Sequence, residues 1–191
     1  MRIIAIDPGT SSDGLVDLAG PETVLKAEQM PHEDVLDYIA SCPRPATVVV
    51  EQIVSYGVGI GNDTLRTCEH AGAVVQQARV YMHSTVWLSR PAVCRRLMGS
   101  TRSASKGEVW QRVVDLYGGT DRAIGGVRCG KCKGKGWFGR GRPPCPAGCA
   151  EGDDGVWYET LPGPLSGVRA HCRDAMALAA VYLIDEGVIN P

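Results

Sequence analysis

The sequence predicts an α/β fold in which helices cover a β-sheet. The first observation is a continuous apolar run over residues 2–7, which is typical of a strand buried on both faces. The second is that two short strands are followed by a helix with proline in its first turn and then by a returning strand. These elements are expected at residues 14–18, 23–27, 31–42 and 47–51. A β-meander, a helical crossover and a returning strand indicate a layered α/β domain.

The rest of the expected core adds one strand and four helices. A long helix is predicted over residues 63–80, and the largely apolar final helix, 169–186, must be buried against the sheet. The packed face of the long helix is expected to carry Leu65, Cys68, Gly72 and Val75 or Gln76. The other expected elements are a strand at 85–88 and helices at 91–98 and 106–117.

Charge is strongly segregated along the chain, although the formal net charge is only −1. Residues 1–69 hold 4 Lys or Arg against 11 Asp or Glu, and residues 143–191 hold 2 against 7. Residues 70–142 hold 14 against 3. This basic middle block predicts a surface that contacts phosphate, with an ordinary solvated face as the alternative.

Composition also bears on the compartment. The sequence has no apolar run of about 18 residues, so no membrane span is expected. The N-terminus enters a strand at once, which leaves no room for a signal peptide. We therefore expect a reducing, cytoplasmic compartment. In that setting the eight cysteines favour metal ligands or thiols over disulfides.

Residues 118–168 differ from the rest because they are rich in Gly, Pro and Cys and show little periodicity. A structureless loop of this length is unusual inside a domain unless something orders it. Its cysteines form a CxxC pair and a CxxxC pair that supply four thiolates, as one tetrahedral zinc ion requires. The predicted ligands are Cys129, Cys132, Cys145 and Cys149, with disulfides or unligated thiols as alternatives. We thus expect a core of residues 1–117 and 169–191 interrupted by a zinc-binding insert.

The segment between the two cysteine pairs is basic and aromatic, without an acid. A basic hairpin with aromatic side chains at its tip can bind phosphates and stack bases. The residues concerned are Lys131, Lys133, Lys135, Trp137, Phe138, Arg140 and Arg142. The alternative is that the two aromatic residues only pack on the zinc site.

Three acidic residues and one histidine lie where apolar strands end or where the apolar last helix begins. Asp7 closes the first strand, Glu51 closes the strand at 47–51, and His171 and Asp174 open the last helix at positions i and i+3. An unpaired buried carboxylate is costly, and a metal or a phosphate would explain it. Each acid alone could instead cap a turn, and His171 could instead be a helix cap or a core histidine. Together they predict a site for two Mg²⁺ ions, and the imidazole tilts the preference toward Mn²⁺.

These motifs together resemble a known family. The first is Ile4-Ala-Ile-Asp-Pro-Gly-Thr10, and the second is Val50-Glu-Gln52. They are followed by Glu69-His-Ala-Gly72, by Gly99 with Ala104-Ser-Lys-Gly107 and Val109, and by His171, Asp174-Ala175 and Ala177-Leu-Ala179. In this order and spacing they resemble the RuvC-type Holliday-junction resolvases of the RNase H-like superfamily. The resemblance covers residues 1–117 and 169–186.

The resemblance implies a mixed five-stranded sheet with helices on both faces, a homodimer, and hydrolysis of DNA with two divalent metals. It implies that Asp7, Glu51, His171 and Asp174 are the metal ligands and that Lys106 lies near the scissile strand. The other expected DNA contacts are Tyr56 and Arg102, with the basic and aromatic residues of the insert. The family usually has an aromatic residue three positions after the glutamate, where this chain has Val54. Tyr56, two positions further on, is expected to replace it in part.

The sequence thus predicts a structure-selective endonuclease that resolves four-way junctions by paired symmetric nicks. Asp7-Pro-Gly-Thr10 also resembles a phosphate loop of actin-like ATPases and sugar kinases, but that architecture needs two such domains and this chain is too short. A catalytically silent junction-binding protein is a second alternative, although a pure binder needs no acids facing a phosphate. Flaps, forks or other nucleic acids remain alternative substrates.

Overall fold

The computed structural model describes residues 1–54, 60–99, 104–135, 145, 149–151 and 156–190. The chain divides into two compact units, here called the core unit and the insert unit. The core unit comprises Met1–Val113 and Val168–Pro191, and the insert unit comprises Val114–Gly167.

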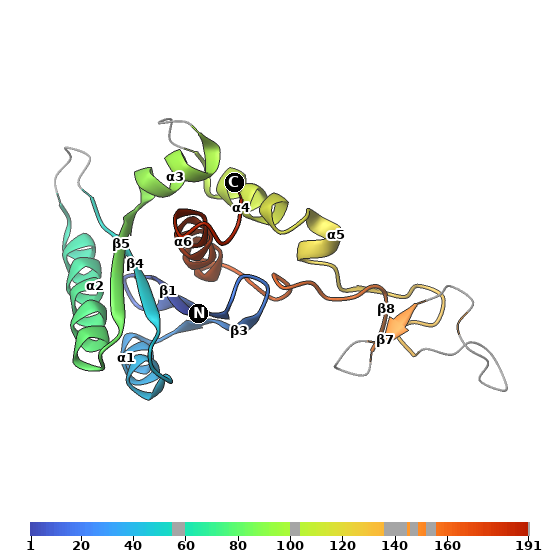
Figure 1. Ribbon diagram of the computed structural model, residues 1–191, viewed down its shortest axis with the longest axis horizontal. Coiled ribbons are helices and arrows are strands. Elements are labelled where there is room, and N and C mark those ends of the chain that lie inside the picture. Colours follow the sequence, from blue (N-terminus) through green and yellow to red (C-terminus); the bar gives the residue numbers. More distant parts are fainter. Residues whose placement is uncertain (55–59, 100–103, 136–144, 146–148, 152–155, 191) are drawn as a thin grey trace. The chain divides into compact units, whose positions relative to one another are not determined.

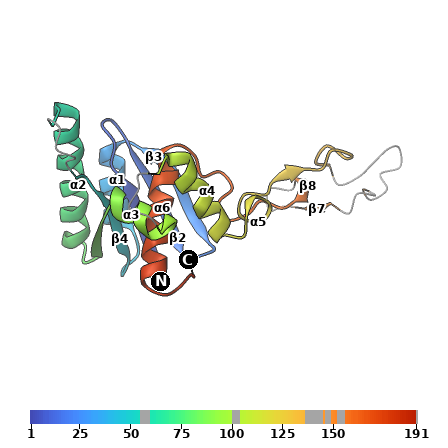
Figure 2. The same ribbon diagram turned by 90° about the horizontal axis from the view of Figure 1, so that it is seen from above.

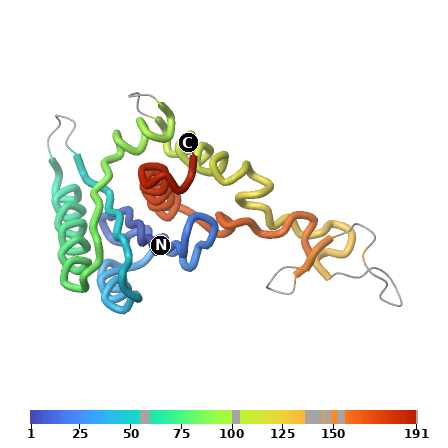
Figure 3. Tube along the Cα trace, in the orientation of Figure 1, coloured from blue at the N-terminus to red at the C-terminus, as the bar shows by residue number. Residues whose placement is uncertain are grey.

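The core unit is built on a mixed five-stranded sheet, as the family resemblance implies, with strand order β3-β2-β1-β4-β5 (Figure 1). β2 is antiparallel to both of its neighbours, whereas β1, β4 and β5 run parallel. In Figure 3, β1 and β4 lie side by side although a meander and a helix separate them in the chain. The strands are β1 (Arg2–Asp7), β2 (Asp13–Ala19), β3 (Val24–Met30), β4 (Thr47–Gln52) and β5 (Ser84–Ser89).

Helices cover both faces of this sheet, as Figures 1 and 2 show. α1 (His32–Ser41) and α2 (Asn62–Val80) pack on one face, and α6 (His171–Asp185) packs on the other, where α3 (Arg90–Met98) contacts it. α4 (Lys106–Leu116) begins in the core unit. Among the described residues, no helix has both the length and the apolar character needed to cross a membrane.

Alternation along the strands decides which side chains face α6. Ile4 and Ile6 of β1 lie in one buried cluster with Val48 and Val50 of β4 and with residues of α1 and α2. Because successive strand residues point to opposite faces, Asp7 and Glu51 must point to the other face. The two strand-end acids therefore project toward α6.

The packed face of α2 differs from the one predicted. The buried residues of α2 are Thr67, Ala71, Val74, Val75 and Ala78. Of the predicted set only Val75 is buried, whereas Leu65 is 50% exposed and Cys68 and Gly72 also face outward. Both stripes have helical spacing, so spacing alone could not choose between them. The small and β-branched stripe packs on the sheet and leaves the Leu65 stripe uncovered in the single chain.

The insert unit contains more regular structure than its sequence predicts. A one-turn helix, α5 (Thr120–Ala123), precedes a three-stranded antiparallel sheet in which β8 lies between β6 and β7. Its strands are β6 (Val127–Arg128), β7 (Ala150–Glu151) and β8 (Trp157–Thr160). Strands of two residues are too short to show periodicity, so sequence patterns could not reveal them.

Candidate functional site

The end of β1 and the start of α6 bring three potential ligands together. Asp7 is only 5% exposed, and its Oδ2 lies 2.9 Å from Nδ1 of His171. One ligand atom from each of Asp7, His171 and Asp174 lies within 4.8 Å of the others. Residues that are 164 positions apart thus form one compact group of oxygen and nitrogen donors.

Glu51 joins this group through Asp7, with which it shares a side-chain hydrogen bond. Burial raises the pKa of Glu51 to about 8, and the hydrogen bond and negative charge of Asp7 add to the effect. Burial also raises the pKa of Asp7, and the charge of Asp174 acts in the same direction. Two carboxyls buried side by side are costly to ionise, and a bound cation would stabilise their ionised form.

Two basic side chains bind the third acid. Arg90 Nη1 donates to Asp174 Oδ1 over 2.7 Å, and Lys106 Nζ donates to Asp174 Oδ2 over 2.5 Å. Lys106 was expected near the site, whereas Arg90 was missed. The sequence places Arg90 directly after a predicted strand, but only the structure shows that this strand, β5, runs parallel to β4. Residues that follow parallel strands gather at the same edge of a sheet.

A glycine lets α6 approach the sheet. Gly14 pairs with Asp7 in the β1–β2 ladder, and a Cβ atom at Gly14 would lie 2.4 Å from the carbonyl carbon of His171. Ala170, which precedes His171, takes a φ of 45°, a conformation that residues with side chains rarely adopt. Close contact and backbone strain therefore both occur where His171 enters the site.

The loop after Asp7 is held by a polar network around the buried carboxylate of Asp13. The Gly9 N–H donates to Asp13 Oδ1 over 3.0 Å, and Asp13 Oδ2 lies 2.9 Å from His32 Nδ1. The His32 ring stacks on His70 of α2 with centroids 3.3 Å apart. These contacts tie the loop to α1 and α2, so they help to hold the backbone around Asp7.

The four cysteines of the insert unit also converge. The Sγ atoms of Cys129 and Cys145 are 3.7 Å apart, and those of Cys132 and Cys149 are 3.8 Å apart. One Sγ from each lies within 4.8 Å of the others. Trp157 of β8 packs against the cluster. The four thiols are thus arranged around a common centre.

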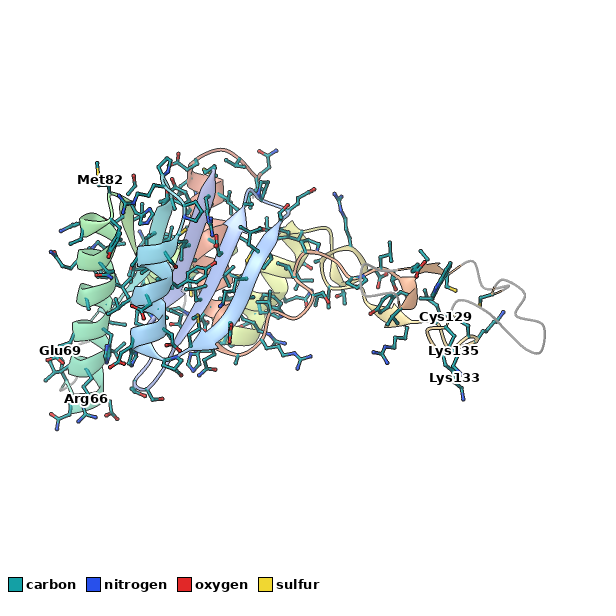
Figure 4. All side chains as sticks on the ribbon, turned by 90° about the horizontal axis from the view of Figure 1, so that it is seen from below. Arg66, Glu69, Met82, Cys129, Lys133 and Lys135 are labelled. Atoms are coloured by element: carbon teal, nitrogen blue, oxygen red, sulfur yellow. The ribbon has the colours of Figure 1, made fainter. Side chains whose placement is uncertain are left out.

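The turn after Cys132 presents two of the predicted phosphate contacts. Lys133 and Lys135 are exposed there, as Figure 4 shows. The remaining predicted DNA contacts, Tyr56, Arg102, Trp137, Arg140 and Arg142, lie outside the described residues.

The core unit has the RNase H-like fold of the RuvC type: a mixed five-stranded sheet with helices on both faces. The chain is similar to a structure of Thermus thermophilus RuvC, with a TM-score of 0.59 and 19% identity over 100% of this chain and 99% of that one. It is also similar to T. thermophilus RuvC in complex with a Holliday junction substrate, with a TM-score of 0.56, 19% identity and the same coverage. At this identity the likeness concerns the fold. No family model and no curated protein matches the sequence.

Proposed function

We propose that this protein is a metal-dependent endonuclease that resolves Holliday junctions. The observation that carries the proposal is the convergence of buried Asp7 with His171 and Asp174 at the sheet edge that faces α6, with Glu51 beside Asp7. The fold shared with the RuvC structures, one of which holds a Holliday junction substrate, supports branched DNA as the substrate. The basic block at residues 70–142 is consistent with a phosphate-rich partner.

The donor set fits Mg²⁺ or Mn²⁺. Neighbouring ligands of an octahedral ion bound at 2.0–2.1 Å lie about 3 Å apart. The 2.9 Å between Asp7 and His171 matches that spacing, and a cation would stabilise the ionised forms of the buried carboxyls of Asp7 and Glu51. In the proposal, Asp7, Glu51, His171 and Asp174 hold two divalent ions. Bound ions of this kind supply an activated water nucleophile and stabilise the leaving 3′ oxygen.

The protein's own groups would orient the substrate. Lys106 has a 69% exposed side chain on α4, so its ammonium group can reach a phosphate outside the carboxylate cluster. Arg90 is more enclosed, with 23% of its side chain exposed, and stays beside Asp174. The contact with Asp7 Oδ2 holds the imidazole ring of His171 beside the acids. These residues would keep the scissile phosphate against the acids.

The proposal includes a homodimer, because two symmetric nicks in a two-fold junction call for two sites related by a two-fold axis. The outward stripe of α2 with Leu65, Cys68 and Gly72 is the proposed interface. Ala71 of the same helix is 2% exposed and packs on the sheet, so it is not available to a partner.

We also propose one structural zinc ion in the insert unit. Ligands of a tetrahedral zinc at about 2.3 Å lie about 3.8 Å apart, and the measured sulfur separations are 3.7 and 3.8 Å. Lys133 and Lys135 next to this cluster would contact the DNA backbone. The proposal assumes a cytoplasmic location, where reducing conditions keep cysteines as thiols that can bind zinc.

Cleavage of end-labelled synthetic DNA tests this proposal. The substrates are a mobile four-way junction, a fork, a flap and a linear duplex of matched sequence, each with and without Mg²⁺. The expected result is Mg²⁺-dependent cutting of the four-way junction by paired nicks, with the linear duplex left intact. Preferred cutting of forks or flaps would assign the site to another branched substrate. Junction binding without cleavage would favour the silent binding protein.

A further inference from the structure

Both carboxylate oxygens of Asp174 are engaged by cations of the protein itself. Arg90 Nη1 lies 2.7 Å from Oδ1, and Lys106 Nζ lies 2.5 Å from Oδ2. Only 11% of the Asp174 side chain is exposed. Any divalent ion that used Asp174 as a ligand would have to compete with at least one of these two positive charges.

The two cations differ in how easily they can leave. Lys106 extends from α4 with 69% of its side chain exposed, so its ammonium group can move into solvent. Arg90 is 23% exposed and stands at the first position of α3, where Ser89 Oγ caps the helix by accepting from the Ala92 N–H and Pro91 restricts the first turn. Its backbone is well fixed and its guanidinium is enclosed, so the positive charge of Arg90 stays at the site.

We propose that Arg90 is a positioning residue that serves as the resident counter-ion of Asp174 and opposes metal loading until a DNA phosphate arrives. This inference rests on the function proposed above. A guanidinium binds phosphate as readily as carboxylate, with two parallel N–H donors. A backbone phosphate near Asp174 would therefore turn the Arg90 guanidinium toward itself within the site and free an oxygen of Asp174. Metal binding and DNA binding would then strengthen each other.

Mn²⁺ binding to the full-length, zinc-loaded protein without DNA tests the inference, because it does not depend on cleavage. Unbound Mn²⁺ is counted by electron paramagnetic resonance for the wild type, Arg90→Gln, Arg90→Lys, Arg95→Gln and, as the variant that lacks a metal ligand, Asp7→Asn. Arg95 is an exposed residue of the same helix and serves as the matched charge control. Removing one enclosed positive charge should tighten Mn²⁺ binding on the order of tenfold in Arg90→Gln. Arg90→Lys and Arg95→Gln should stay within about twofold of the wild type.

A merely structural ion pair predicts the opposite pattern. Arg90→Gln would then lower the melting temperature and leave Mn²⁺ affinity unchanged or weaker, and either affinity result overturns the inference. If Arg90→Gln does not fold, Arg90→Met, which keeps an apolar stem, undergoes the same measurement. Wild-type protein that binds no more Mn²⁺ than Asp7→Asn would overturn the proposed metal site itself. Wild-type binding without tightening in the Arg90 variants would overturn only the role of Arg90.

Discussion

Asp7 Oδ2 and His171 Nδ1 lie 2.9 Å apart, although one residue ends the first strand and the other begins the last helix. The contact depends on β1 and β2 leaving space for α6. At that point β2 contributes Gly14, whose lack of a side chain allows the His171 backbone to pass close by.

Replacing Gly14 by Ala should therefore damage the site by steric overlap. The new Cβ would lie 2.4–2.7 Å from atoms of His171, so α6 must shift or the strand must bend. We expect a loss of about 1–3 kcal/mol in the free energy of unfolding, measured by urea denaturation. Gly107→Ala is the control, because Gly107 lies in α4 with only Ser105 Oγ, at 4.0 Å, near its Cβ position. That change should be neutral or slightly stabilising. Equal effects of the two changes would contradict the close contact.

The site residues that could be predicted from the sequence are the polar residues at the ends of apolar segments. Asp7 and Glu51 could be found because each ends an apolar run, and His171 and Asp174 because they open an apolar helix. Arg90 could not be found in this way. Its importance depends on β5 lying beside β4, and that adjacency is a property of the fold.

The packed face of α2 and the short strands of the insert unit also depend on the fold, so the sequence could not reveal them. Two stripes of α2 satisfy helical spacing, and only packing on the sheet selects the one with Ala71 and Val74. The strands of the insert unit are too short to carry a periodic signal, whereas its cysteine spacing is informative without any secondary structure. That the insert acts as a separate zinc domain stays a prediction.

The raised pKa of Glu51 predicts an unusual pH dependence of stability in the absence of divalent metal. Burial raises this pKa from 4.5 to about 8 in the folded chain. Between these values the folded state holds a proton that the unfolded state has lost, so stability falls as the pH rises, by at most about 1.4 kcal/mol per pH unit. Thermal unfolding in magnesium-free buffer from about pH 5 to about pH 8 measures this fall.

Glu51→Gln provides the comparison for this measurement. Gln cannot ionise, so the variant should lose most of the pH dependence and should be more stable than the wild type near pH 8. Added Mg²⁺ should reduce the fall in the wild type, because the cation stabilises the ionised pair. A wild-type stability that rises over this range would show that Glu51 is ionised in the folded chain.

The proposed dimer interface predicts an effect specific to one leucine. Leu65→Asp would place a charge in the outward stripe of α2 and should weaken dimerisation at least about tenfold. Leu25→Asp on β3 is a matched control, because Leu25 is 51% exposed and Leu65 is 50% exposed. Light scattering should give about twice 20.4 kDa for the wild type and the control. A wild type that is monomeric at micromolar concentration would remove the dimer from the proposal.

Zinc should stabilise the insert unit and leave the core unit largely independent of it. Replacing Cys129 and Cys132 by Ser removes two of the four ligands, so zinc measured by elemental analysis should fall from one ion per chain to none. Far-ultraviolet circular dichroism should retain the helical signal of the core unit. Cys68→Ser, at an exposed position on α2, should keep the zinc.

The same unit should contribute to the salt dependence of DNA binding. Lys133→Gln with Lys135→Gln should keep the zinc and lower the slope of log affinity against log salt by up to about 2, about one for each lost phosphate contact. Lys26→Gln, which alters a lysine paired with Glu28 on β3, should leave the slope unchanged. An unchanged slope in the double variant would limit the insert to a structural role.

Cleavage and binding of a mobile four-way junction by Asp7→Asn, compared with the wild type, test the proposed metal site most directly. Asn keeps the size of the buried side chain and removes its charge, so the metal site loses a ligand while the fold is preserved. Cleavage in Mg²⁺ should fall by more than about a hundredfold, and junction affinity should be equal or tighter because repulsion of the phosphates is reduced. Near wild-type cleavage by Asp7→Asn would contradict the assignment of this carboxylate cluster as the catalytic metal site.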